Sequence, residues 1–140
     1  MIAVIFLLYL FEDKDIDKTA HLYTPTKQQS ELVQGSEVKL PIVEDIRIQH
    51  NQEEAEVCFF NPKEQHYYLT YTLHIRGEMV YESKFIKPGE AIKKIKLNQS
   101  LPLGSYEAEM EIKSFDIESK KEAHGQRQKV HVEAYEKEGR

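Results

Sequence analysis

Strict alternation of apolar and polar side chains in two stretches limits the fold of this chain more than any other feature. A period of two places successive side chains on opposite faces of a β-strand. In residues 67–76 the apolar positions are Tyr67, Leu69, Tyr71, Leu73 and Ile75. In residues 106–113 they are Tyr106, Ala108, Met110 and Ile112, and the positions between them are charged. The second pattern is typical of an antiparallel sheet with one face in water.

Turn residues divide the chain from residue 41 to residue 136 into further short segments. Asn61-Pro62 and Arg76-Gly77-Glu78 end two of them, and Lys87-Pro88-Gly89-Glu90 has the order of Pro and Gly that a type II turn needs. Ile92 is out of phase with the later apolar residues of its segment, which indicates a bulge or a strand that starts late. The segments predict strands over residues 43–48, 55–61, 67–76, 79–83, 92–97, 106–113 and 130–134.

These strands predict an all-β fold, a seven-stranded antiparallel sandwich of the immunoglobulin-like or fibronectin-III-like kind with an apolar segment before it. Tyr106 follows Leu103-Gly104-Ser105. That is the place of the tyrosine corner in such sandwiches, where the hydroxyl bonds to backbone upstream. Tyr106 is therefore expected to be buried.

The N-terminal part of the chain differs in composition from the predicted sandwich. Residues 1–11 carry no charge, and residues 12–40 are polar with scattered apolar positions. The apolar block is shorter than the roughly 20 residues of a membrane-spanning helix and has no basic start. It is interpreted as the outer part of a truncated anchor or signal, or alternatively as a short amphiphilic or buried segment of a soluble protein, such as a first strand. Residues 12–40 are expected to be a linker, residues 41–136 the domain, and residues 137–140 a tail.

Charge and cysteine content exclude several classes of function. The net charge is −5 and the pI is about 5.7, so there is no basic field for a nucleic-acid backbone. A single cysteine, Cys58, excludes an internal disulfide and a cysteine-based zinc cage. No motif supplies a nucleophile with its base, and no histidine or cysteine pair has zinc-ligand spacing. The chain is predicted not to be an enzyme and to need no metal or other cofactor.

One group of polar residues qualifies as a candidate interaction surface. If the strands over residues 67–76, 106–113 and 130–134 are neighbours, their outward side chains share a face. The candidate residues are His74, Glu107, Glu109, Glu111 and His131. The competing interpretation, which is favoured, is a solvated face that prevents aggregation.

A resemblance rests on the turns and strands between Asn61-Pro62 and Leu103-Gly104-Ser105-Tyr106. The segments that carry it also include Val80-Tyr81-Glu82-Ser83, Ile86-Lys87-Pro88-Gly89 and Ile95-Lys96-Leu97. Over residues 41–135 the chain resembles uncharacterised surface or lipoprotein-like domains of Gram-positive bacteria. The resemblance implies a β-sandwich on the outer side of a membrane anchor, and it implies no catalytic residue.

Two functions of different classes follow as hypotheses. In the first, the chain is a non-catalytic interaction or structural module, tethered to the extracytoplasmic side of the cell membrane through its N-terminal segment, with an unidentified protein or cell-envelope component as partner. In the second, it is a soluble inhibitor or regulator of a protease that uses the loops 61–66 and 84–90. A secreted or cytoplasmic location is the alternative to the membrane.

Overall fold

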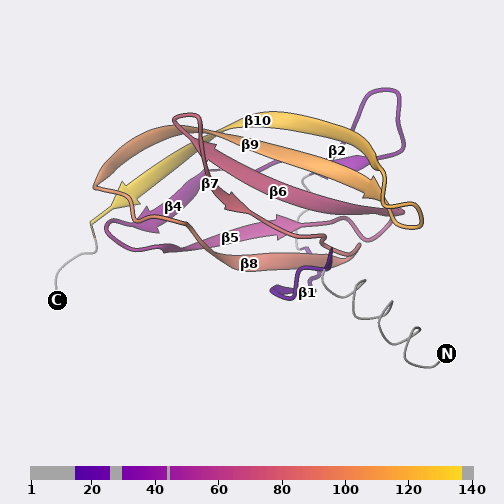
Figure 1. Cartoon of the computed structure of the whole chain (residues 1–140), viewed down its shortest axis with the longest axis horizontal. Helices are drawn as coiled ribbons and strands as arrows, with labels where there is room; N and C mark the ends of the chain where they lie inside the picture. The colour runs from indigo at the N-terminus through magenta and orange to yellow at the C-terminus, as the bar shows by residue number, and fades with distance from the viewer. Residues whose placement is uncertain (1–14, 26–29, 44, 137–140) are drawn as a thin grey trace.

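The computed structural model describes residues 15–25, 30–43 and 45–136. The predicted apolar segment 1–11 and the tail 137–140 lie outside these residues. The described residues form ten strands in three sheets (Figure 1). The first sheet has the order β1 (Ala20–Leu22), β8 (Glu90–Lys96), β5 (Glu54–Phe60). The second has the order β4 (Ile46–Gln49), β10 (Glu122–Tyr135), β9 (Gly104–Asp116), β6 (Tyr67–Ile75), β7 (Glu78–Glu82). The third is the hairpin of β2 (Ser30–Leu32) and β3 (Lys39–Pro41).

All seven predicted strands are present, as β4 to β10, so the all-β prediction is confirmed. The structure differs from the prediction in strand number, because β1, β2 and β3 are additional. It also differs in direction, since β4 runs parallel to β10, with Ile46 opposite Val132 and Ile48 opposite Ala134. The remaining pairings between named strands are antiparallel.

The core lies between the five-stranded and three-stranded sheets and consists of the residues that the alternation marked as inward. Leu69, Tyr71 and Leu73 of β6 are completely buried, as are Met110 and Ile112 of β9. Across the sheets the Phe59 and Tyr71 rings stack with their centroids 4.6 Å apart. Burying one large apolar side chain stabilises a fold by about 1.5–3 kcal/mol.

The irregular phase at Ile92 coincides with a shift in the pairing of β8 with β5. Glu56 pairs with Lys94, but the next pair is Phe59 with Ile92, so β5 has one residue more than β8 in this interval. Such a bulge increases the local twist of the ladder. In the same interval Ile92 and Ile95 of β8 are both buried although they are three residues apart. The predicted bulge is present, and its extra residue lies in β5.

Much of the expected linker 12–40 belongs to the folded structure. Val38 and Leu40 are completely buried, and Ala20 is 7% exposed. Ala20 pairs with Ile92, which places β1 at the edge of the three-stranded sheet. The buried carboxylate of Asp17 accepts a hydrogen bond from the backbone N–H of Lys84 at 2.8 Å. Isolated apolar residues within polar sequence therefore contribute to the core, and residues 15–25 and 30–40 are not a stalk.

The predicted tyrosine corner is confirmed. Tyr106 is 7% exposed, and its hydroxyl donates a hydrogen bond to the carbonyl oxygen of Pro102 at 2.6 Å. The bond fixes the approach to β9, and so it helps to set which residues of β9 face outward. Within the described ranges, no helix has the length and apolar character needed to cross a membrane.

Candidate functional site

The outer face of β6, β9 and β10 carries the candidate residues in ordered rows. His74 of β6 lies opposite Glu109 of β9, and Glu109 lies opposite Lys129 of β10. In an adjacent row Glu107 lies opposite His131. Side chains directly opposite each other on one face have Cβ atoms about 4.5–5.5 Å apart. The register therefore brings residues from three strands together on one surface.

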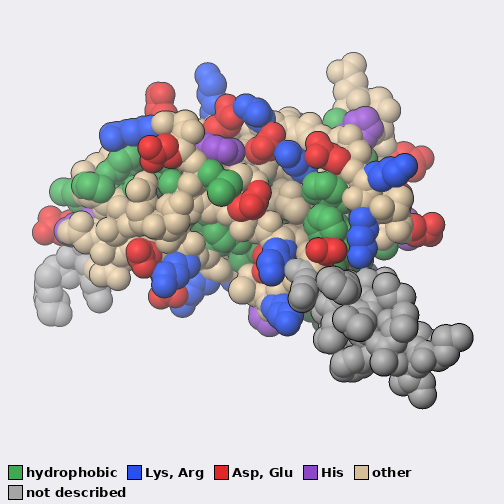
Figure 2. All heavy atoms as spheres, in the orientation of Figure 1, with side chains coloured by type: hydrophobic (Ala, Val, Ile, Leu, Met, Phe, Trp, Pro, Cys, Tyr) green, Lys and Arg blue, Asp and Glu red, His purple; other side chains and the backbone are tan. Residues whose placement is uncertain are grey.

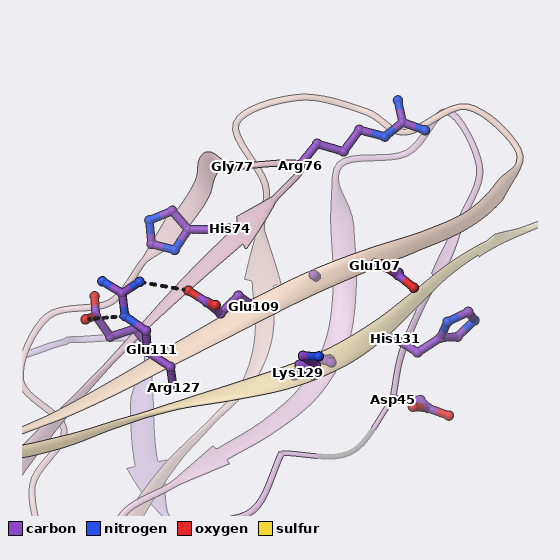
Figure 3. A pocket seen from close by; sticks show the side chains of 12 residues that line it. Asp45, His74, Arg76, Gly77, Glu107, Glu109, Glu111, Arg127, Lys129 and His131 are labelled. Atoms are coloured by element: carbon purple, nitrogen blue, oxygen red, sulfur yellow. Dashed lines mark hydrogen bonds and ion pairs between the residues drawn. The ribbon is translucent and has the colours of Figure 1, made fainter.

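A hollow of about 790 Å³ lies on this surface. Its lining includes all five residues of the predicted candidate surface, His74, Glu107, Glu109, Glu111 and His131. Figure 3 shows them from close by. The lining also includes seven residues that were not predicted to belong to this surface: Asp45, Arg76, Gly77, Ala108, Arg127, Lys129 and Val130. We refer to this feature as the outer-face hollow.

Arg127 offsets the repulsion within the row of glutamates. Its Nη1 donates a hydrogen bond to Glu109 at 3.1 Å, and its Nε lies 3.4 Å from a carboxylate oxygen of Glu111 (Figure 3). The Arg127 side chain is 67% exposed, so water and salt screen both ion pairs. The pairs orient the three side chains and contribute little to the stability of the fold.

His74 presents an unsatisfied polar atom at the hollow. Its Nδ1 is buried and has no hydrogen-bond partner among the described residues. Most buried polar atoms in folded proteins have a protein or water partner, so His74 Nδ1 is an exception among the described residues. Figure 3 shows the ring on the same side of the sheet as Glu109 and Arg127.

The opposite end of the hollow has a different set of charges. Glu107 and His131 face each other across β9 and β10, and Asp45 comes just before β4, which pairs with β10 (Figure 3). Arg76 lies in the tight turn between β6 and β7, where Arg76 and Gly77 have φ values of 53° and 80°. The Arg76 guanidinium lies 4.9 Å from the centre of the Tyr106 ring. The tyrosine corner thus also positions a cation at the rim.

The basic residues of the hollow could have been found by extending the alternation backwards from Val130. The last strand was predicted over residues 130–134, but β10 begins at Glu122. Counting in steps of two from His131 places Lys129 and Arg127 on the same outward face. This part of β10 shows no alternation of apolar and polar residues, because the inward position between Arg127 and Lys129 holds the polar Gln128.

The hollow combines both signs of charge and lies open on a sheet face. Figure 2 shows that positive and negative side chains are interspersed over the visible surface of the described part of the molecule. Among the described residues, no group of three or more His, Cys, Asp or Glu side chains is arranged to hold a metal ion. The arrangement is suited to contacts with charged groups of a partner.

Comparison with protein-family models, with curated proteins and with solved structures gave no match to this chain.

Proposed function

We propose that the chain is a non-catalytic interaction module on the extracytoplasmic side of a membrane. Residues 1–11 tether it, and the outer-face hollow binds a protein or a cell-envelope component, in keeping with the resemblance to Gram-positive surface domains. The observation that carries the binding surface is the convergence of charged residues from β6, β9 and β10 on one hollow of about 790 Å³.

Strand order supports assigning the fold to the immunoglobulin-like class. The sheet β4-β10-β9-β6-β7 faces a sheet in which β8 pairs with β5, and sequence neighbours β5 and β6 lie in different sheets. Tyr106, near the start of β9, has the hydrogen bond of a tyrosine corner. In this assignment β1, β2 and β3 are additions to a seven-stranded sandwich.

The chemistry of the hollow supports a partner with both charged and hydrogen-bonding groups. Lys129 has no ion pair among the described residues, whereas Arg127 is shared by two glutamates. His74 Nδ1 has an unused hydrogen-bonding position. Charged pairs across an interface chiefly give specificity and fast association.

Site-specific photocrosslinking in intact host cells tests the binding surface. A photoreactive amino acid replaces Lys129 in the hollow, and the matched control replaces Lys96, an exposed lysine of β8 that lies on the other sheet. We expect a discrete adduct only from position 129, and we expect Arg127→Glu to abolish it. Equal adducts from both positions, or none from position 129, would contradict the proposal.

Fractionation tests the tether separately. The full-length protein should sediment with membranes of its host, and added protease should digest residues 41–135 without prior lysis. Recovery only from the soluble cytosol would exclude the tether.

A second candidate function, protease inhibition, is favoured by one observation. Asn61 is buried and joins the two loops 61–66 and 84–90: its Nδ2 donates to the carbonyl oxygens of Tyr67 at 2.7 Å and Ile86 at 2.8 Å. The N–H of Gly89 donates to the Asn61 carbonyl oxygen at 2.8 Å. A rigid loop pair loses little entropy on binding.

The isolated protein should inhibit a protease only if this second function is correct. Replacement of residues 87–90 should then remove inhibition, whereas Arg127→Glu should leave it intact. The reverse dependence would assign the inhibition to the hollow.

A further inference from the structure

The connection between the apolar segment and the folded domain is short. Only Glu12, Asp13 and Lys14 separate residues 1–11 from Asp15, the first described residue. The Asp15 carbonyl oxygen accepts a hydrogen bond from the N–H of Phe85 at 2.9 Å, and its carboxylate lies 3.7 Å from Lys120 Nζ. The chain is therefore bound to the domain from Asp15 onward.

Two further bonds hold this attachment. The N–H of Asp17 donates to the Phe85 carbonyl oxygen at 2.8 Å, and the Asp17 carboxylate accepts from the Lys84 N–H at 2.8 Å. β1 then pairs with β8. Three residues of sequence therefore lie between residue 11 and the first attached residue, and not the 29 residues of a linker over 12–40.

Chain geometry limits how far the domain can lie from residue 11. Four extended Cα–Cα steps join Phe11 to Asp15, which span at most about 14 Å. One headgroup layer of a bilayer is about 5–8 Å thick. If residues 1–11 are in a membrane, the end of the domain that holds Asp15 lies at or just above the headgroups.

The side chains at this end are of the kind that settles at a lipid interface. The Tyr68 and Phe85 rings stack 5.0 Å apart, and Phe115 lies 4.9 Å from Phe85; all three are only partly buried. Leu22, which pairs with Glu90 at the start of β8, is 86% exposed. Aromatic rings and lysine stems bridge apolar and aqueous layers.

Charge at this end is mixed, and so the contact depends on apolar and aromatic side chains. Lys84, Lys87 and Lys121 are exposed, and Lys120 is paired with Asp15. Glu118 lies 3.7 Å from His66 in the same region.

We propose that the end of the domain formed by Leu22, Phe85, Phe115 and the loop 116–121 rests against lipid headgroups. This inference depends on the tether in the proposed function. β6, β9 and β10 then point away from the bilayer. Glu109 lies six positions before Phe115 in β9, which places the part of the outer-face hollow at Glu109 about 20 Å from the membrane.

Tryptophan fluorescence tests the orientation, because the natural chain contains no Trp. The full chain carrying Ile117→Trp is bound to vesicles of phosphatidylglycerol and phosphatidylcholine, with and without brominated acyl chains. Leu103→Trp is the matched control, since Leu103 is exposed and precedes the opposite end of β9. We expect blue-shifted emission and strong quenching by bromine at position 117, and neither at position 103.

A second reporter, Leu22→Trp, covers the case in which the substitution at position 117 disturbs the loop, because the Leu22 side chain is 86% exposed. Vesicle flotation is measured on the same samples. Flotation without quenching at positions 22 and 117, or with equal quenching at position 103, overturns the orientation and leaves the tether intact. Failure to float overturns both.

Discussion

The two faces of β9 follow different rules although they alternate residue by residue. The inward side chains of Tyr106, Ala108, Met110 and Ile112 are buried in the core. The outward Glu107 is exposed, and the outward Glu109 contacts solvent and Arg127. The free energy gained by burying apolar area is not reduced by salt, whereas water and salt weaken exposed ion pairs. The inner face therefore determines stability, and the outer face is free to serve binding.

The largest loss of stability is expected from a substitution on the inner face of the five-stranded sheet. Leu73→Ala removes a completely buried side chain of β6 and should lower the free energy of unfolding by about 2–5 kcal/mol. Urea denaturation followed by circular dichroism measures it. Glu107→Ala, on the outer face of the neighbouring strand, is the control and should change stability by less than about 0.5 kcal/mol. Similar losses for both variants would remove the distinction between the faces.

The next effect is a loss of stability in alkaline solution that originates in the core. Burial raises the pKa of Tyr71 well above its usual value, and burial followed by the charge of Asp17 raises the pKa of Tyr81. The unfolded chain then releases these protons first, so the stabilisation is complete below pH 10 and falls as the pH rises above about 10. Tyr71→Phe should flatten this fall in denaturation midpoints measured from pH 8 to pH 11.

A variant that keeps the same slope above pH 10 would show that other groups cause it. Tyr71→Phe also removes the hydrogen bond from the Tyr71 hydroxyl to the Phe60 carbonyl oxygen. A constant loss of stability at neutral pH is therefore expected in addition to the change in slope.

A smaller loss of stability is expected where the residues around Asp17 attach to the sandwich. Asp17→Ala removes an acceptor for the N–H groups of Thr19 and Lys84 and should cost about 1–3 kcal/mol. Hydrogen exchange should accelerate at Tyr23, whose N–H donates to the Gly89 carbonyl oxygen. Asp17→Asn keeps one acceptor oxygen and should lose less. Unchanged exchange at Tyr23 would show that β1 does not depend on this carboxylate.

The smallest effect on stability belongs to the outer face. Arg127→Ala breaks the ion pairs with Glu109 and Glu111 and should cost less than about 1 kcal/mol, with a smaller loss in high salt. Thermal unfolding at two ionic strengths measures it, and Arg127→Lys controls for charge. A loss as large as that of Leu73→Ala would mean that the outer face also carries the fold.

The sequence predicted the parts of the fold in which each strand shows its own alternation. β6 and β9 were predicted because several successive inward positions in each strand are apolar. The three-residue strands β1, β2 and β3 were not predicted, since Ala20 and Leu40 are isolated apolar residues in polar sequence. Such strands depend on partners that are distant in the sequence, which local periodicity does not report.

The candidate surface was predicted only in part for a related reason. Its acidic residues and histidines alternate with apolar inward residues of the same strand, so the strand pattern identifies them. Arg127 and Lys129 lie where β10 is polar on both faces, because Gln128 is used to bind the Val43 N–H at 2.8 Å and the Pro41 carbonyl oxygen at 2.7 Å. A polar core-side residue with a specific backbone partner removes the pattern that identifies a strand.

The attachment at Asp17 has a mechanical consequence. The described chain begins at Asp15 near the β9–β10 turn, and β10 ends at the opposite end of the molecule (Figure 1). A pull between these ends runs along the strands and loads the cross-strand bonds of β9 and β10 together, in shear. The contacts of residues 15–23 are fewer and release first. Under such a pull, release of residues 15–23 would lengthen the chain ahead of the sandwich while the two large sheets stay packed, so these residues would give way before the core.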